Sequence, residues 1–128
     1  MLFEAMNLRS SHGVVSLATS PDAQTWTYQQ VVLQEPFHLS YPYVFEQGGE
    51  YYMVPESCRI GAVRLYHADP FPYRWRLVDT LINLPLADSS VVHFRAVGGC
   101  WEHKRIGGFT SFTPINCPDH GPNIQKVP

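Results

Sequence analysis

An internal repeat of about 50 residues constrains the fold of this chain more than any other feature of its sequence. Residues 15–18, followed by Trp26, match residues 64–67, followed by Trp75. The two tryptophans are 49 positions apart (75 − 26). Repeats of this length that consist of four strands are typical of propeller blades. A blade cannot bury both of its faces alone, so the sequence predicts a stack of neighbouring sheets.

Strand patterns fill both repeats, whereas amphipathic helix patterns are nearly absent. Short runs rich in β-branched and aromatic residues, separated by turn residues, predict strands. The predicted strands are 13–19, 26–33, 43–46, 50–54, 63–68, 75–82 and a seventh over 90–94. A turn is expected at 20–23, where Pro fixes φ and Asp bonds its own backbone, and a hairpin at Gly48-Gly49. We therefore expect an all-β fold.

The length of the chain predicts that the propeller is partial. Closed propellers have roughly four to eight four-stranded blades, so a ring needs on the order of 200 residues. The chain has 128 residues, which supplies about two to three blades. We expect residues 1–101 to form these repeats and 102–128 an irregular tail. Because an open stack leaves strand edges free, we expect self-association or completion by missing blades.

Composition and charge argue against two classes of partner. The net charge is −2 and no basic run occurs, so the sequence predicts no nucleic-acid binding. No apolar run approaches the ~20 residues of a membrane helix, so no membrane partner is expected. The N-terminus does not resemble a signal peptide, and an odd count of three cysteines fits a reducing compartment. These features predict a cytoplasmic protein without a cofactor.

A family resemblance begins at residues 38–57, HLSYPYVFEQGGEYYMVPES, and continues through 63–66, the Phe71-Pro72 and Trp75 pattern, and 87–90. These strings resemble the five-bladed propeller domain at the N-terminus of plant glucosamine inositolphosphorylceramide transferases and of related bacterial proteins. That domain is similar to the arabinanase, invertase and levansucrase group of glycoside hydrolase propellers. The resemblance covers about residues 2–101 and implies a partial five-bladed propeller with a carbohydrate-related role.

The resemblance also implies candidate site residues. In the hydrolase relatives, catalytic carboxylates stand at the start of the innermost strand of each blade. The matching positions here are Tyr41 and Asp88, so Asp88 stands where a catalytic acid is expected and Tyr41 replaces another. Since glycoside hydrolysis normally needs two carboxylates, this departure favours a binding module over an active hydrolase. The alternative is an active glycosidase completed by another chain or by missing blades.

Four further residues are candidates for contacts with sugar. Glu56 ends a strand and is the second candidate acid, although a rim carboxylate bonded to loop amides is the favoured alternative. His38 and Tyr41 flank one strand start, where an imidazole could bond a hydroxyl and a phenol could stack on a ring, or both could simply pack. Glu46 lies inside an apolar strand, so we expect it to face the channel or to pair with Arg64.

One alternative concerns the tail. Cys100 and His103, and Cys117 and His120, form two pairs with the same spacing, and two thiolates with two imidazoles suit tetrahedral zinc. This pattern is the basis of a third hypothesis, a small zinc-binding protein. Our main prediction assigns no metal and takes a glycan as the ligand of the chain.

Overall fold

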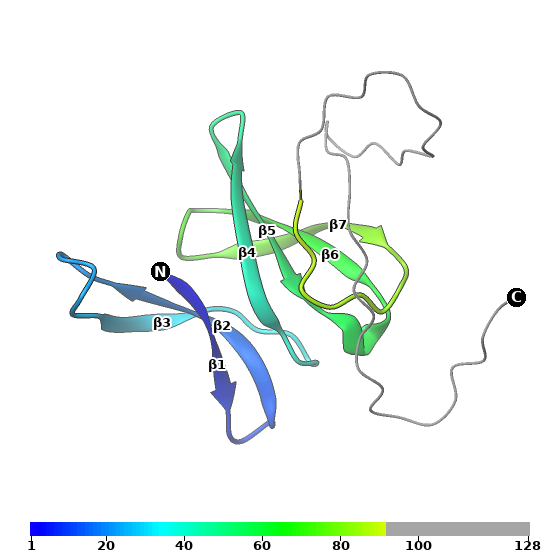
Figure 1. Cartoon of the computed structure of the whole chain (residues 1–128), viewed down its shortest axis with the longest axis horizontal. Coiled ribbons are helices and arrows are strands. Elements are labelled where there is room, and N and C mark those ends of the chain that lie inside the picture. Colours follow the sequence, from blue (N-terminus) through cyan, green and yellow to red (C-terminus); the bar gives the residue numbers. More distant parts are fainter. Residues whose placement is uncertain (92–128) are drawn as a thin grey trace, which may run out of the picture.

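The computed structural model describes residues 1–91, which form two antiparallel sheets (Figure 1). The first sheet has three strands, β1 (Leu2–Asn7), β2 (His12–Thr19) and β3 (Thr27–Leu33). The second is a four-stranded meander of β4 (Ser40–Gln47), β5 (Glu50–Glu56), β6 (Val63–Ala68) and β7 (Trp75–Ile82), with a 3-10 turn at Cys58–Ile60. No α-helix, and so no membrane-spanning helix, occurs in these 91 residues. The all-β prediction is confirmed.

The strand predictions agree with the structure at six of the seven positions, and two differences remain. The structure adds β1 at the N-terminus, which our strand pattern did not include. Residues 90 and 91, where a seventh strand was predicted to begin, are not in a strand, and residues from 92 onward lie outside the described part. The predicted domain boundary at 101 lies there too. A closed propeller is not seen in residues 1–91.

The two sheets are structural repeats of one another, because their strands pair in equivalent registers. In the first sheet Leu17 pairs with Gln30, and in the second Leu65 pairs with Asp79. Both pairs of strands contain two register shifts. These lie between Val15/Ser16 and Leu17/Ala18 in one sheet, and between Val63/Arg64 and Leu65/Tyr66 in the other. The sequence repeat therefore reflects two sheets with the same pairing and the same irregularities.

The main hydrophobic core lies between the two sheets. Val15 and Leu17 of β2 pack with Met53 of β5, Tyr66 of β6 and Trp75 at the start of β7. Burial of apolar area at about 25 cal/mol per Å² makes this contact the main force that holds the sheets together. A second cluster covers the opposite face of the second sheet and consists of Val54, Val63, Leu65 and Leu86.

A polar cluster ties the β3–β4 connection to β6. Tyr66 donates its phenolic hydrogen to Glu35 Oε1 at 2.8 Å. Arg64 Nη1 lies 3.7 Å from the same oxygen, and the Arg64 guanidinium lies 5.0 Å from the centre of the Phe37 ring. Burial, and then the hydrogen bond to Glu35, raise the pKa of Tyr66 far above its ordinary value. The cluster fixes the chain where it crosses between the sheets.

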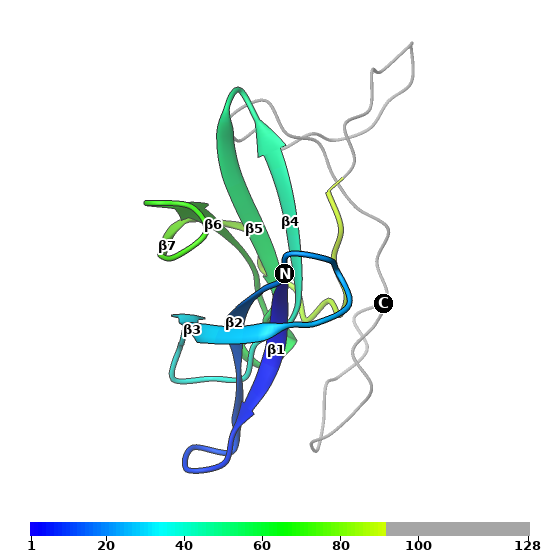
Figure 2. The ribbon, with the colours of Figure 1, turned by 90° about the vertical axis from the view of Figure 1, so that its left-hand side faces the viewer.

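Both predicted turns form. Asp22 Oδ1 accepts the backbone N–H groups of Gln24 and Thr25 at 2.9 and 2.8 Å. Gly48 and Gly49 have φ of 64° and 84°, the positive values that a tight two-residue hairpin requires. The β4–β5 hairpin that this turn closes projects away from the three-stranded sheet (Figure 2).

Candidate functional site

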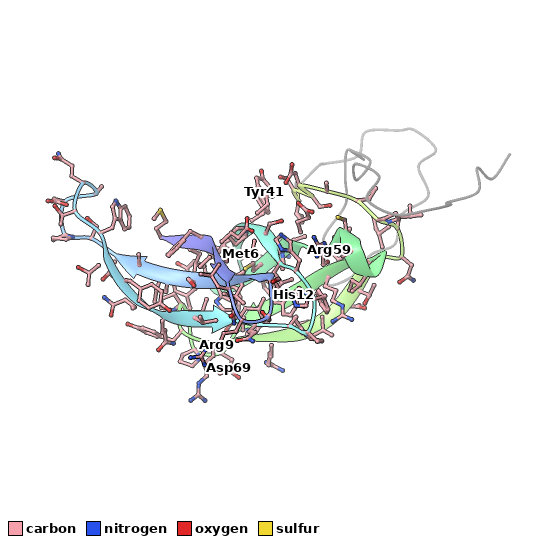
Figure 3. All side chains as sticks on the ribbon, turned by 90° about the horizontal axis from the view of Figure 1, so that it is seen from below. Met6, Arg9, His12, Tyr41, Arg59 and Asp69 are labelled. Carbon is pink, nitrogen blue, oxygen red and sulfur yellow. The ribbon has the colours of Figure 1, made fainter. Side chains whose placement is uncertain are left out.

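The start of β4 carries a β-bulge that exposes Tyr41. Ser40 pairs with Glu56, but the next pair is Tyr43 with Val54, so two residues of β4 oppose one residue of β5. Tyr41 has φ of 40°, a left-handed conformation that is uncommon for a bulky residue. Its side chain is 45% exposed and projects from one edge of the molecule, opposite the edge that carries Asp69 (Figure 3).

The segment 88–91 lies beside the start of β4. The Tyr43 hydroxyl donates to the carbonyl of Val91 at 3.0 Å, and the Tyr41 hydroxyl lies 3.4 Å from Ser90 Oγ. Asp88, two residues before Ser90, is exposed and also left-handed, with φ of 47°. The two residues that the resemblance placed at equivalent strand starts are thus brought to one region of the structure.

Glu56 is half-buried at the end of β5. It pairs with Ser40 at one end of the β4 bulge. Its Oε1 lies 3.1 Å from the Cys58 sulfur, which is disulfide-bonded and so makes a close approach without a proton to donate. The count of three cysteines had not led us to expect a disulfide. Within residues 1–91, no ion pair involves Glu56 or Asp88.

We call Tyr41, Glu56 and Asp88 the strand-start site. An exposed aromatic ring can stack on a sugar ring, and two carboxylates can accept hydrogen bonds from hydroxyl or ammonium groups. The chemistry of this set suits a polar ligand with an apolar ring face.

His38 lies close to this region but both of its ring nitrogens already have partners. Nδ1 accepts the backbone N–H of Gly13 at 2.9 Å, and Nε2 lies 3.4 Å from Glu4 Oε1. Because Nδ1 accepts a hydrogen bond, the proton of the neutral ring is on Nε2, directed at Glu4. Leu39 N–H also donates to the Gly13 carbonyl at 3.0 Å. The geometry gives His38 a role in joining the two sheets.

Gly13 is a residue that sequence reasoning missed. A Cβ added to it would overlap the backbone oxygen of Leu39 and come within 2.8 Å of Glu4 Oε1 and His38 Cε1. Only glycine allows the β3–β4 connection to approach β2 so closely. No local pattern identifies this requirement, because the contact joins segments 25 residues apart in sequence.

Glu46 lies at the opposite end of β4 from Tyr41. Its Oε1 accepts the Gly49 N–H at 2.9 Å, so it closes the hairpin turn, and its side chain is exposed. Of the two alternatives for Glu46, pairing with Arg64 is not seen, because Arg64 pairs with Glu35. Glu46 is therefore separate from the strand-start site.

The zinc hypothesis involves residues that the structure does not describe. Cys100, His103, Cys117 and His120 all lie beyond residue 91. In residues 1–91, no group of three or more His, Cys, Asp or Glu side chains is arranged to hold a metal ion.

Comparisons with known proteins agree on one family. A sequence model described as glucosamine inositolphosphorylceramide transferase 1, N-terminal, matches residues 1–104. The protein named glucosamine inositolphosphorylceramide transferase 1 in Arabidopsis thaliana is 39% identical over 98 residues, which is 76% of this chain and 13% of that protein. The protein of the same name in Oryza sativa subsp. indica is 39% identical over 102 residues, which is 79% of this chain and 13% of that protein. The chain thus spans about an eighth of the length of these relatives. No solved structure matches significantly.

Proposed function

The chain belongs to the family of glucosamine inositolphosphorylceramide transferase N-terminal domains, and from this premise we propose that it is a carbohydrate-recognition module. We further propose that its two repeated sheets are blades of an incomplete propeller. The ligand that we propose for the strand-start site is an amino sugar of the glucosamine type. The observation that carries the proposal is that the exposed Tyr41 follows Ser40, which pairs with Glu56, while the Tyr41 hydroxyl lies 3.4 Å from Ser90 Oγ, two residues after Asp88.

An amino sugar suits this set for electrostatic reasons. The ammonium group of glucosamine would donate charge-assisted hydrogen bonds to a carboxylate, and such bonds are roughly twice as strong as neutral ones. The apolar face of the pyranose ring would lie against the Tyr41 phenol. Neutral sugars of the same shape lack the first interaction, so charge is the basis of selectivity.

The identities of the residues at the two equivalent repeat positions favour a binding function over a hydrolytic one. A glycosidase needs an acid and a second carboxylate on opposite sides of the scissile bond. Tyr41 stands at one of the two equivalent repeat positions and Asp88 at the other, so these two positions provide a single carboxylate. A recognition module needs only the ring and the hydrogen-bond acceptors that are present.

Isothermal titration calorimetry tests this proposal with glucosamine, glucose and N-acetylglucosamine at a pH at which the amine is protonated. We expect glucosamine to bind about tenfold more tightly than the two neutral sugars, since a charged hydrogen bond is worth about 1.5–3 kcal/mol. Asp88→Asn should remove that preference. Asp69→Asn, which makes the same charge change at the opposite edge, should keep it. Equal binding of glucose and glucosamine, or an unchanged preference in Asp88→Asn, would contradict the proposal.

A further inference from the structure

The chain around Asp88 repeats the chain around Tyr41. Leu39 belongs to the main core and Leu86 to the second cluster. Each leucine shares its cluster with a residue pair that the register equates, Val15 with Leu17 in one and Val63 with Leu65 in the other. Two residues after each leucine, the backbone is left-handed. Residues 86–91, which we call the Asp88 segment, therefore repeat the chain at the start of β4.

The two equivalent segments are held differently at their first residue. The Leu39 N–H donates to the carbonyl of Gly13 at 3.0 Å, which fixes the start of β4 to β2. The register of the sheets equates Gly13 with Gly61. The Leu86 N–H does not repeat this bond, because it donates to the carbonyl of Leu84 at 3.0 Å, inside its own loop. Among residues 1–91, the Asp88 segment thus lacks the backbone hydrogen bond that fixes its counterpart.

A side chain of β4 supplies a different link to the Asp88 segment. The Tyr43 hydroxyl donates to the carbonyl of Val91 at 3.0 Å, in a partly buried position. The Tyr41 hydroxyl lies 3.4 Å from Ser90 Oγ, a longer contact that is exposed. Hydrogen bonds between two oxygens are normally about 2.5–3.0 Å long, so the bond from Tyr43 is the stronger of the two links.

We propose that Tyr43 is a positioning residue of the strand-start site. Its hydroxyl holds the Asp88 segment beside β4 and so sets the place of the Asp88 carboxylate relative to Tyr41. Because this hydroxyl is engaged with Val91, Tyr43 acts through Asp88 and does not itself contact the ligand. This role rests on the proposed function, in which a carboxylate of the site accepts hydrogen bonds from the ammonium group of an amino sugar.

The expected effect is on selectivity as well as on affinity. A carboxylate on a loosely held segment must be immobilised when the ligand binds, and that ordering opposes binding. The ammonium group depends most on a carboxylate held in place, whereas the apolar face of the sugar lies against Tyr41. Removing the Tyr43 hydroxyl should therefore weaken the binding of glucosamine more than that of glucose. A residue that served the fold alone would affect both sugars alike.

Backbone 15N relaxation tests, without any ligand, whether Tyr43 holds the segment. Tyr43→Phe keeps the ring and removes only the hydroxyl, and Tyr28→Phe makes the same change at an exposed tyrosine of β3. Rigid backbone has order parameters of about 0.85 and flexible backbone of less than about 0.6. We expect residues 88–91 to pass from the first range to the second in Tyr43→Phe and to stay rigid in Tyr28→Phe, while β5 and β6 stay rigid in both. Rigid residues 88–91 in Tyr43→Phe would overturn the proposal.

Calorimetry with glucosamine and glucose tests the positioning role. The preference for glucosamine, about tenfold in the wild-type chain, should fall to about threefold or less in Tyr43→Phe and be kept in Tyr28→Phe. In an Asp88→Asn chain, Tyr43→Phe should cause no further loss of glucosamine affinity, because it acts through that carboxylate. An equal loss of affinity for both sugars, or a further loss in the Asp88→Asn chain, would overturn the proposal. If the wild-type chain binds neither sugar, the proposed function fails by itself, and the order parameters still decide whether Tyr43 holds the segment.

Discussion

Tyr41 and Asp88 lie 47 positions apart (88 − 41) and share a left-handed backbone, with φ of 40° and 47°. In residues 1–91 only Ser11 and Ala23 are other non-glycine residues with positive φ. Backbone strain of this kind persists where the surrounding structure imposes it, and it is often found at functional sites. Each residue begins the equivalent segment of its repeat. The left-handed strand start is therefore a repeated feature, and its side chain differs between the two repeats.

Replacing Asp88 by glycine tests the strain. Glycine adopts positive φ without steric cost, so we expect Asp88→Gly to leave the free energy of unfolding unchanged or to raise it by up to about 1 kcal/mol. Asp79→Gly, a matched change inside β7, should lower it by about 1 kcal/mol, because glycine weakens a strand. Urea unfolding measures both. A similar loss for the two variants would show that Asp88 is unstrained.

Gly13→Ala tests the close approach of the two sheets. The new Cβ would overlap the Leu39 carbonyl oxygen, and overpacking of this kind costs about 1–3 kcal/mol or more. We expect a loss of about 3 kcal/mol in the free energy of unfolding. Gly48→Ala is the control, since it has open space and only an unfavourable φ, and it should cost about 1 kcal/mol. A Gly13→Ala chain as stable as Gly48→Ala would mean that the connection moves aside without cost.

The Tyr66–Glu35 hydrogen bond makes a prediction for a double-mutant cycle. Tyr66→Phe should lower the free energy of unfolding by about 1–2 kcal/mol, because a partly buried carboxylate loses its donor. Glu35→Gln should cost a similar amount, and the two changes together should cost less than their sum. Additive effects, measured by urea unfolding of all four proteins, would mean that this bond does not stabilise the fold.

The same residue predicts alkaline behaviour. The pKa of Tyr66 is raised in the folded chain, so its contribution to stability is complete below the ordinary tyrosine pKa of 10.0 and falls as the pH rises above it. Between pH 9 and 11, stability should therefore fall less steeply in Tyr66→Phe than in the wild type. If stability fell equally steeply with pH in both proteins, the Tyr66 hydroxyl would be exposed to water in the folded chain.

The Asp22 turn predicts acid behaviour. Hydrogen bonds from Thr25 and Gln24, and then from Ser20, lower the pKa of Asp22 from 3.8 to about 2. A depressed pKa in the folded state gives a contribution that is complete above about pH 4 and is lost as the pH falls through 2. Asp22→Asn keeps the acceptor oxygen but cannot titrate, so its urea midpoint should change less between pH 5 and pH 2.5. The same change in both proteins would mean that the turn opens before Asp22 is protonated.

Local patterns were sufficient to predict most strands and both turns. Runs of β-branched and aromatic residues identified β2 and β3, and Gly48-Gly49 identified the hairpin, because these features depend on residues close in sequence. Repeat matching went further, since it anticipated two similar sheets, although matching 15–18 with 64–67 was one residue away from the structural register, in which Leu17 is equivalent to Leu65. β1 was missed because its short sequence, LFEAMN, alternates weakly between apolar and polar residues.

Contacts between distant segments were beyond the sequence. Glu46 is a charged residue in an apolar strand, which is typical of a site residue, but its carboxylate accepts a hydrogen bond from Gly49 in the hairpin turn. His38 was a candidate either to bond a sugar hydroxyl or to pack, and in the structure its ring nitrogens contact Gly13 and Glu4. In each case the partner that the side chain contacts depends on the three-dimensional arrangement of the chain, which local sequence patterns do not reveal.

The central claim is that Tyr41, Glu56 and Asp88 recognise a glycan, and chemical-shift mapping tests it most directly. The 15N-labelled chain is titrated with glucosamine while the backbone amide resonances are followed. We predict saturable shifts at 40–41, 56–57 and 88–90, with little change at the hairpin tip around Glu46 and Gly49. Shifts confined to the hairpin tip, or no saturable shifts at concentrations well above 1 mM, would contradict the assignment of this site.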